Sequence, residues 1–491
     1  MRFLFDRIDY ERMRTMPYDP SHMGLDRMRD FLRRLGNPER GLPIVHVAGT
    51  KGKGSTAAMI AGILTAAGYR TGLFTSPHLE RLEERMAVDG HLCPAEELVE
   101  LVRMVRPAVE GMDANGQVGS GKSEFGSAGV AGPDAQSLTL DTSPSTPHAP
   151  SSVPQGPTYF EITTALALLH FARAKVDAAV LEVGLGGRLD ATNVCTPQLA
   201  VITSISFDHT QQLGNTLAAI AGEKAGIVKP GVPVVSGVTA EEPREVVRRI
   251  CRERDARLIE LGQDFDFEYQ PPHHLEQAPA HGQLDFVSPL PPAPHSPPFT
   301  SYAISLPGRH QATNAALALA TVEELRRAGW SIPETAVRHA LADLHWPARV
   351  EVVARCPTVV LDAAHNVASI EALAATIDES FSAQRRLLIF ATTQDKDLRG
   401  MLRCLLGRFD EVFFTRYLNN PRAVPPQELD VLAAELTGRH CPVYIEPSDA
   451  WDAVLQRAQP QDLVCVTGSF FIAAEMRRQL EAKPFPREVP A

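Results

Sequence analysis

The chain is poor in cysteine, and its cysteines do not cluster. Seven occur among 491 residues, and no two form a Cys-x-x-Cys pair. This spacing matches neither a disulfide framework nor a zinc site, and it favours a reducing compartment. No apolar run reaches the roughly 18 residues that cross a membrane, and charged residues interrupt the N-terminal segment, unlike a signal peptide. We therefore expect a cytoplasmic protein without a membrane partner.

Basic residues are also in the minority. Lys and Arg number 48 against 59 Asp and Glu, the net charge is −11, and no basic block offsets it. A nucleic-acid partner is disfavoured, because it requires a concentrated positive surface. The composition, 44% hydrophobic and 22% charged, is typical of globular proteins. The length predicts two or three domains, each able to bury a core.

A glycine-rich run between a predicted strand and a predicted helix is the most informative feature. Apolar residues indicate a strand over 44–48, and a helical pattern follows over 55–67. Three glycines between them let the backbone turn tightly and direct several N–H groups at one anion. Lys53 brings a positive charge to the outer phosphates, while Ser55 or Thr56 offers a hydroxyl to magnesium. The run therefore predicts a nucleotide site.

This run departs from the common phosphate-loop pattern. Its leading glycine lies only four residues before Lys53, and Gly54 separates that lysine from Ser55. A tight turn with a solvated lysine is the alternative interpretation. The strand–loop–helix context, with three glycines and two hydroxyls, favours phosphate binding.

Strand-like and helical segments alternate beyond this loop, which is typical of a mostly parallel sheet covered on both faces. A helix is predicted over 23–35. Further strands are predicted at 71–75, 178–183, 199–204 and 232–236, and further helices at 95–105, 160–174, 217–228 and 243–254. We expect an α/β nucleotide-binding domain with a phosphate loop over 1–343.

Two segments interrupt this alternation. Residues 113–157 are rich in Gly, Ser, Pro and Thr, and residues 271–299 are crowded with proline and histidine. Neither can bury enough apolar surface to offset the entropy of ordering, so both are predicted to be mobile surface insertions. The histidines of the second segment suggest metal binding, but a solvated loop is the favoured interpretation.

A second series of strands and helices predicts a smaller Rossmann-like α/β domain over 344–491. Its strands are expected at 358–361, 386–390, 411–415, 443–445 and 463–466, and its helices at 367–377, 426–436, 450–457 and 471–480. Polar signatures follow three strands, at 362–366, 394–397 and 467–469. Ligands of open α/β sheets lie beyond the carboxyl ends of strands, so these residues are expected to face a cleft.

Three further residues carry candidate chemistry. Glu182 ends a buried-looking strand, where an acidic residue can hold magnesium beside a phosphate; a helix cap or surface turn is the alternative. His209 is equally consistent with a metal or reacting-group role and with a structural one, because magnesium prefers oxygen. For Lys224, a surface salt bridge is the default interpretation. If Lys224 is buried instead, its pKa would be lowered and its neutral amine could react with carbon dioxide.

Together these motifs resemble the Mur ligase superfamily and, more closely, its folylpolyglutamate and dihydrofolate synthases. The motifs occur in family order over nearly the whole chain outside the two insertions: 46–55, 75–79, 158–161, 182–193, 208–209, 223–226, Asn314, 346–349 and 362–366. The run 182–193 is close to diagnostic. Two departures are Lys51, where many bacterial members have Asn, and Ala348, which replaces the usual Gly.

The resemblance implies roles for individual residues. ATP would be bound by Thr50, Lys51, Gly52, Lys53, Gly54, Ser55, Asn314, Arg349 and Asp362. Two magnesium ions would be ligated by Ser76, Glu182 and His209. The pterin pocket would be lined by Thr158, Tyr159, Phe160, Glu161, Leu189, Asp190 and Ala191. Lys224 would be the family's carbamylated lysine, and His365 and Ser469 would contact glutamate, so catalytic roles are expected for Lys53, His209, Lys224 and His365.

The resemblance also implies a reaction. L-Glutamate would be joined to dihydropteroate, to the γ-carboxylate of reduced folyl-(poly)glutamates, or to both, through an acyl phosphate made with ATP. Because water hydrolyses that intermediate, two domains that close over the site are expected. The resemblance further implies a monomer.

Two alternatives stay open. The first is a UDP-muramyl amino-acid ligase of the same superfamily, which the motifs at 75–79 and 158–161 disfavour. The second is a nucleotide-binding regulator without ligase activity. It predicts damaged ATP or metal positions, but Lys53, Glu182 and Arg349 are all present.

Overall fold

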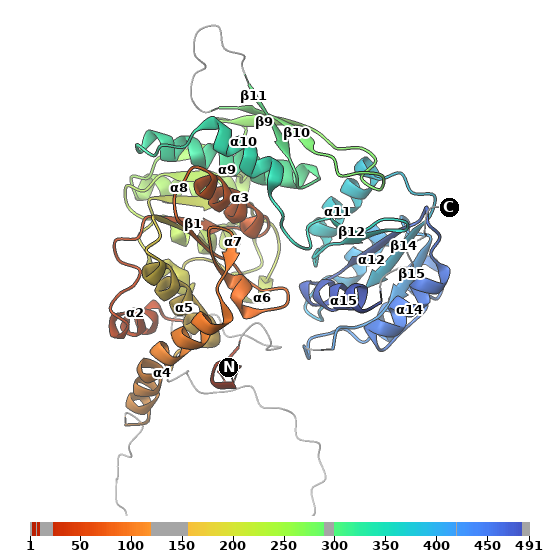
Figure 1. Ribbon diagram of the computed structural model, residues 1–491, viewed down its shortest axis with the longest axis horizontal. Coiled ribbons are helices and arrows are strands. Elements are labelled where there is room, and N and C mark those ends of the chain that lie inside the picture. The colour runs from red at the N-terminus through yellow and green to blue at the C-terminus, as the bar shows by residue number, and fades with distance from the viewer. Residues whose placement is uncertain are drawn as a thin grey trace, which may run out of the picture.

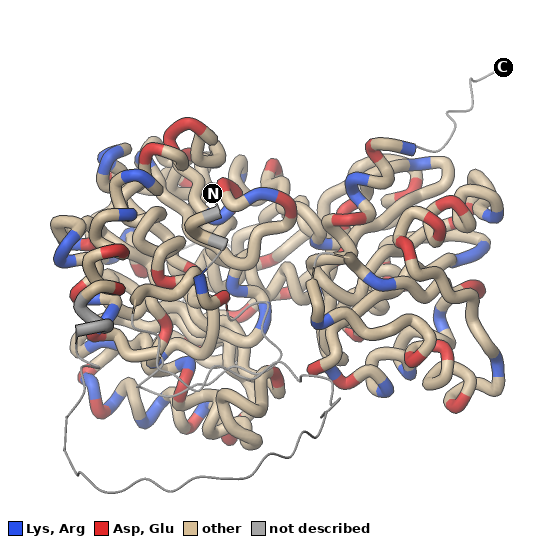
Figure 2. The backbone as a smooth tube through the Cα atoms, turned by 90° about the horizontal axis from the view of Figure 1, so that it is seen from below, with Lys and Arg blue, Asp and Glu red and all other residues tan. Residues whose placement is uncertain are grey.

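The computed structural model describes residues 2–5, 7–9, 23–118, 156–288, 299–418 and 420–483. They form two α/β lobes that lie side by side, the larger one N-terminal (Figure 1). Basic and acidic positions are intermixed along the backbone of both lobes (Figure 2). Within the described ranges, no helix combines the length and apolar character needed to span a bilayer.

The larger lobe is built on an eight-stranded sheet in the order β4-β3-β2-β5-β1-β6-β7-β8. The six strands from β2 to β8 in this order run parallel, while β3 and β4 add an antiparallel edge. Their bounds are β1 (Ile44–Ala48), β2 (Thr71–Phe74), β3 (Met86–Val88), β4 (His91–Leu92), β5 (Ala178–Glu182), β6 (Leu199–Ile202), β7 (Val234–Ser236) and β8 (Leu258–Glu260).

Helices cover both faces of this sheet, because its central strands point successive apolar side chains to opposite faces. Val45 and Val47 of β1 pack in one core with α3 (Lys53–Ala66), α9 (Arg309–Arg327) and α10 (Glu334–Asp343). Ile44 packs in the other with α2 (Leu25–Arg34), α4 (Ala95–Val118) and α5 (Tyr159–Ala174). The remaining helices of this lobe are α1 (Arg2–Phe5), η1 (Leu82–Arg85), η2 (Ala191–Val194), α6 (Thr210–Leu213), α7 (Leu217–Lys224), η3 (Ala225–Ile227) and α8 (Glu241–Glu253).

The predicted insertion at 271–299 is largely wrong. Gly282–Val287 form β10, the central strand of an antiparallel sheet with β9 (Asp266–Gln270) and β11 (Thr300–Ile304). Leu284 and Phe286 alternate into the core, and Leu275 is buried in the smaller lobe. This period-two apolar pattern outweighs the proline and histidine content. Residues 289–298 lie outside the described ranges.

The structure describes the first predicted insertion and the histidines of the second only in part. In the segment 113–157, residues 113–118 continue α4, and 119–155 are not among the described residues. His273, His274 and His281 each bond to a different partner, and no metal-binding group of His, Cys, Asp or Glu occurs in the described chain. His295 falls outside the described ranges.

The smaller lobe has a five-stranded sheet in the order β12-β13-β16-β14-β15, parallel except for β12. Its elements are β12 (Glu351–Ala354), β13 (Thr358–Leu361), α11 (Val367–Ser380), β14 (Arg386–Phe390), α12 (Leu398–Leu405), β15 (Glu411–Phe414), α13 (Pro426–Thr437), α14 (Pro447–Arg457), β16 (Leu463–Thr467) and α15 (Phe470–Ala482). The strand predicted at 443–445 is wrong, since Val443 makes only an isolated bridge to Phe414.

Candidate active site

The phosphate loop lies between the carboxyl end of β1 and the first turn of α3. Gly52 has a φ of 80°, and a β-carbon there would lie 2.1 Å from Asn314 Oδ1. A β-carbon at Gly49 would lie 1.9 Å from Thr203 Oγ1. Both positions therefore require glycine. The loop is held from behind, because Thr203 Oγ1 donates to Lys51 O at 2.6 Å and Thr50 N donates to Ser204 O at 2.8 Å.

Asn314, which the resemblance assigns to the nucleotide, packs directly against this loop. It is buried on α9, and its Nδ2 donates to Gln311 Oε1 at 3.0 Å. Its side-chain oxygen lies where a side chain at position 52 would have to be placed. The contact of Asn314 with adenine stays a prediction.

Glu182 ends β5, next to β1, and its carboxylate faces the phosphate loop. Its Oε2 accepts from Ser76 N at 3.0 Å, and a β-carbon at Gly54 would lie 3.4 Å from the same oxygen. Burial raises the pKa of Glu182, while the charge of Lys53 acts in the opposite direction. The ends of β1, β2 and β5 thus bring together Lys53, Ser76 and Glu182, three residues predicted for phosphate and magnesium.

His209 lies on the same cavity as Ser76, at the start of α6. Its φ of 48° is left-handed, and burial lowers its pKa to about 4 although the charge of Asp208 opposes this. Its Nε2 lies 3.9 Å from Asp208 Oδ1. Its role as a magnesium ligand stays a prediction.

Lys224 is buried, so the default interpretation of a surface salt bridge is wrong. Its Nζ donates to Gly49 O, at the start of the phosphate loop, at 2.9 Å. Burial, with the nearby charge of Lys53, lowers its pKa to about 7. The surface ion pair of this helix belongs to the preceding residue, Glu223, which contacts Arg188 at 2.8 Å.

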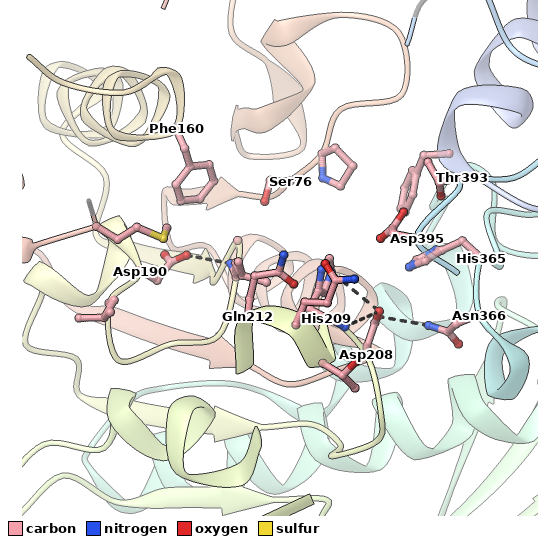
Figure 3. Close-up of a pocket in the computed structure, with 18 of the residues that line it drawn as sticks. Ser76, Phe160, Asp190, Asp208, His209, Gln212, His365, Asn366, Thr393 and Asp395 are labelled. Carbon is pink, nitrogen blue, oxygen red and sulfur yellow. Dashed lines mark hydrogen bonds and ion pairs between the residues drawn. The ribbon is translucent and has the colours of Figure 1, made fainter. Parts of the chain in front are cut away.

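A cavity of about 710 Å³ lies between the two lobes beside this loop. In Figure 3, Phe160 and Asp190 stand at one end, Ser76 and His209 in the middle, and His365, Asn366 and Asp395 at the other end. The end in the larger lobe is mainly apolar, with Met23, Leu25, Met28, Phe160, Leu185, Leu189 and Ala191 among its lining residues. The end in the smaller lobe is charged and polar, with His365, Asn366, Asp395, Lys396, Arg422 and Ser469.

Six of the seven residues predicted for the pterin pocket line this cavity: Thr158, Phe160, Glu161, Leu189, Asp190 and Ala191. Tyr159 does not. It is buried in the core of the larger lobe, with the Arg85 guanidinium 5.5 Å from its ring centroid. The rotation of α5 turns Tyr159 toward that core, while Phe160 and Glu161, the next two residues, face the cavity.

Two buried carboxylates brace the walls of the apolar end. Glu161 Oε2 accepts from Arg27 Nε at 2.9 Å and from Thr158 N at 2.8 Å. Asp190 accepts from Leu185 N at 2.9 Å and from Thr192 Oγ1 at 2.5 Å. Arg27 lines the cavity and was not predicted, because its position on the amphipathic helix α2 indicated only a polar face.

The charged end is joined to the larger lobe by direct contacts. Lys396 Nζ lies 2.8 Å from Asp208 Oδ1, and Asn366 Nδ2 donates to Asp208 Oδ2 at 3.3 Å. Although burial acts to raise it, the pKa of Asp208 is held far below its ordinary value by Lys396 and by two neighbouring histidines. The prediction that 362–366, 394–397 and 467–469 face a cleft is supported, since each range contributes lining residues.

Arg349 and Asp362, predicted for ATP, lie together at the edge of the smaller lobe. Asp362 Oδ2 accepts from Val350 N at 2.9 Å, and the Arg349 guanidinium lies 4.8 Å from the Phe470 ring centroid. Burial raises the pKa of Asp362, against the charge of Arg349. His310 was not predicted: burial lowers its pKa to about 4, and the charges of Arg349 and Lys51 add to this shift.

Comparisons with known proteins agree with this arrangement. The chain matches the Mur ligase middle domain over residues 143–322 and the Mur ligase glutamate ligase domain over 348–470. It is 35% identical over 460 residues to the dihydrofolate synthase/folylpolyglutamate synthase of Bacillus subtilis, covering 93% of this chain and 95% of that protein. It is 32% identical to the Escherichia coli protein of the same name, with coverages of 94% and 92%.

Solved structures give the same result. Folylpolyglutamate synthase of Mycobacterium tuberculosis complexed with ADP superposes with a TM-score of 0.81 at 31% identity, covering 98% of each chain. Escherichia coli FolC in complex with DHPP and ADP superposes with a TM-score of 0.75 at 28% identity, covering 98% of this chain and 96% of that one.

Proposed function

Because the chain belongs to the dihydrofolate synthase/folylpolyglutamate synthase family of Mur ligases, we propose that it is an ATP-dependent ligase for L-glutamate. Its acceptor would be dihydropteroate, the γ-carboxylate of reduced folyl-(poly)glutamates, or both. The observation that carries this proposal is one cavity with an apolar end, a charged end and the phosphate loop beside it. An aromatic ring system fits the first end, and the carboxylates of glutamate fit the basic groups of the second.

The proposed chemistry proceeds in two steps. A carboxylate oxygen of the acceptor attacks the γ-phosphorus of ATP, the bond to the β-phosphate oxygen breaks, and ADP leaves. The amine of glutamate then attacks the acyl carbon, phosphate leaves, and the amine releases a proton. Lys53 and the amides at the start of α3 offset the charge of the transferred phosphoryl group. The two lobes keep water from the acyl phosphate.

Magnesium fits the residues at the loop edge. The buried Glu182 carboxylate faces the loop and accepts from the backbone N–H of Ser76. The carboxylate and the Ser76 hydroxyl are both oxygen donors, which this ion prefers. We keep His209 as a third ligand in the proposal, although nitrogen is a less usual donor. The ion, when bound, would neutralise phosphate charge during transfer.

Carbamylation of Lys224 is also part of the proposal. A neutral amine is required to attack carbon dioxide, and a lysine whose pKa is lowered to about 7 is largely neutral in mildly alkaline buffer. The carbamate nitrogen would lose one proton and a carboxylate would face the loop. Nuclear magnetic resonance with ¹³C-labelled bicarbonate should show a carbamate signal that Lys224→Arg abolishes; equal spectra would contradict it.

We further propose that the chain divides into its two domains at 343/344, that the protein is cytoplasmic and that it is a monomer. Light scattering after gel filtration tests the last of these directly. A mass near 53.5 kDa is expected, and twice that value would contradict a monomer.

A panel of acceptors tests the activity. Purified protein receives ATP, magnesium and glutamate with dihydropteroate, tetrahydrofolate or a UDP-muramyl peptide, and ADP release is measured. We expect release with at least one of the two pterins and none with the UDP-muramyl peptide. Lys53→Ala should abolish it. No release with either pterin would overturn the proposal, and release with the UDP-muramyl peptide alone would favour the cell-wall alternative.

A further inference from the structure

A buried chain of hydrogen bonds links strand β1 to the wall of the cavity's apolar end. Cys195 Sγ lies 3.7 Å from His46 Nδ1, His46 Nε2 lies 2.8 Å from Thr192 Oγ1, and Thr192 Oγ1 donates to Asp190 Oδ1 at 2.5 Å. None of the four residues is more than 2% exposed. Among the four, only Asp190 has an assigned role, as a lining residue of the predicted pterin pocket.

The direction of each bond follows from the donors available. The single hydroxyl proton of Thr192 goes to the Asp190 carboxylate, so the Thr192 oxygen must accept from His46 Nε2–H. Burial, with the charge of Lys229, lowers the pKa of His46 to about 3, so the imidazole is neutral and Nδ1 carries no proton. Nδ1 can therefore accept the thiol proton of Cys195. Each of the three side-chain donors, on Cys195, His46 and Thr192, thus makes one hydrogen bond.

Asp190, at the end of this chain, holds the cavity wall in shape. Its Oδ2 accepts from Leu185 N at 2.9 Å, and its Oδ1 accepts from Thr192 N at 3.0 Å. These bonds close the segment 184–192, which contributes Gly184, Leu185, Leu189 and Ala191 to the lining. The segment also contacts Phe160, because a β-carbon at Gly184 would lie 2.5 Å from its ring. A shift of Asp190 would therefore move both sides of the apolar end.

His46 lies on the face of the sheet opposite to the helix that follows the phosphate loop. Adjacent residues of a strand point to opposite faces. Val45 and Val47 pack in the core that contains α3, the helix that follows the loop. His46 points the other way, toward η2 and the pocket wall. A change at His46 should thus affect the pocket more than nucleotide binding.

We propose that His46 is a positioning residue for the acceptor: through Thr192 it fixes Asp190 and sets the shape of the wall that receives a fused-ring heteroaromatic substrate. This inference rests on the proposed function, because it assigns that substrate to the apolar end. It gives His46 a role beyond packing, and it makes the Thr192 hydroxyl as necessary as the imidazole.

The first test compares two substitutions at His46. His46→Leu removes the donor to Thr192, whereas His46→Gln keeps an amide N–H close to the position of Nε2. Loss of one buried hydrogen bond should raise the KM for the pterin substrate on the order of tenfold. The KM for ATP should stay within about twofold, and His46→Gln should restore most of the pterin affinity. Thermal unfolding followed by circular dichroism shows how much of each variant is folded.

The second test removes the middle hydrogen bond of this row, at Thr192. Thr192→Val removes the hydroxyl with little change of shape, and Thr192→Ser retains it. Thr192→Val should raise the pterin KM as His46→Leu does, and Thr192→Ser should not. If the two residues act through one row of hydrogen bonds, the pterin KM of the double variant His46→Leu/Thr192→Val should be no higher than that of the more impaired single variant. Should His46→Leu fail to fold, the Thr192 pair carries the test alone.

The results that would overturn the inference differ from those that would overturn the function. No ADP release by the wild-type protein with either pterin defeats the proposed function, and the inference with it. Wild-type turnover with an unchanged pterin KM in Thr192→Val defeats the inference alone. An equal rise in the KM for ATP, or a lower melting temperature with unchanged constants, also defeats it.

Discussion

The Lys396–Asp208 ion pair joins the two lobes across the cavity, and its removal should open them. The two side chains are 7% and 9% exposed, so water screens their attraction only weakly. The partners are 188 positions apart and come from different lobes. Lys396→Met keeps the length of the side chain and removes its charge. Asp208 would then retain the hydrogen bond from Asn366 of the smaller lobe.

The magnitude follows from the burial of the pair. Removing one partner of a fully buried ion pair costs about 3–5 kcal/mol. Here the cost is reduced in two ways: Asn366 still donates to Asp208, and the lobes can separate to return Asp208 to water. We therefore expect about 2 kcal/mol in favour of the open arrangement, which corresponds to roughly a thirtyfold change in the equilibrium.

The assay measures whether the acyl phosphate is protected from water. With the lobes apart, water reaches the acyl phosphate, so ADP should be released without formation of the glutamylated product. We expect the ratio of ADP to product to rise from near unity, and small-angle X-ray scattering should show a larger radius of gyration. Lys483→Met is the matched control. It breaks a surface pair in the same lobe, with Asp452 at 2.7 Å and half-exposed partners, and should change neither quantity.

Two outcomes would refute the reasoning. Coupled turnover at the wild-type rate in Lys396→Met would show that the pair does not hold the lobes together. A rise in the KM for glutamate alone, with coupling and radius of gyration unchanged, would show that Lys396 acts on the substrate and not on closure. The double variant Asp208→Asn/Lys396→Met should recover part of the coupling, since it leaves no buried charge unpaired.

Three further predictions concern single residues around the phosphate loop. Gly52→Ala should abolish nucleotide binding measured by calorimetry, because its β-carbon would meet Asn314, whereas Gly68→Ala has a similar positive φ with open space around it and should cost only about 1 kcal/mol of stability. Glu182→Gln should raise the magnesium concentration needed for half-maximal turnover by at least about tenfold, since it removes a charge and keeps the shape; an unchanged titration would exclude Glu182 as a ligand. In CO₂-free buffer the unfolded chain binds one more proton at Lys224 than the folded protein does between pH 7 and 10.5, so stability from urea unfolding should rise across that window, and Lys224→Met should remove the rise.

Local patterns predict the elements that carry the nucleotide end of the site. The strands at 358–361 and 386–390 have the predicted bounds, because a strand buried on both faces is a short, continuous apolar run. The phosphate loop and Glu182 follow such runs directly. Their order in the chain therefore places them at one edge of the sheet, and the structure brings them together as expected.

Residues that reach the cavity through long-range packing could not be predicted in this way. Arg27 meets Glu161 across 134 positions, and no local period encodes that contact. The motif at 158–161 does not distinguish Tyr159 from Phe160. Which of the two side chains faces the cavity depends on the rotation of α5 against its neighbours. By contrast, the alternation of Leu284 and Phe286 in β10 was a readable signal that the proline and histidine content obscured.

The two carboxylates at the apolar end indicate how acceptor specificity arises. Asp190 already accepts from Leu185 N, Thr192 N and the Thr192 hydroxyl, and Glu161 accepts from Arg27 and Thr158. A carboxylate has about four acceptor sites, so a substrate that bonds to either group must share oxygens with the wall. Affinity therefore depends on how firmly the wall is held as well as on direct contact. For this reason substitutions behind the wall, at His46 or Thr192, should act on the same kinetic constant as substitutions in it.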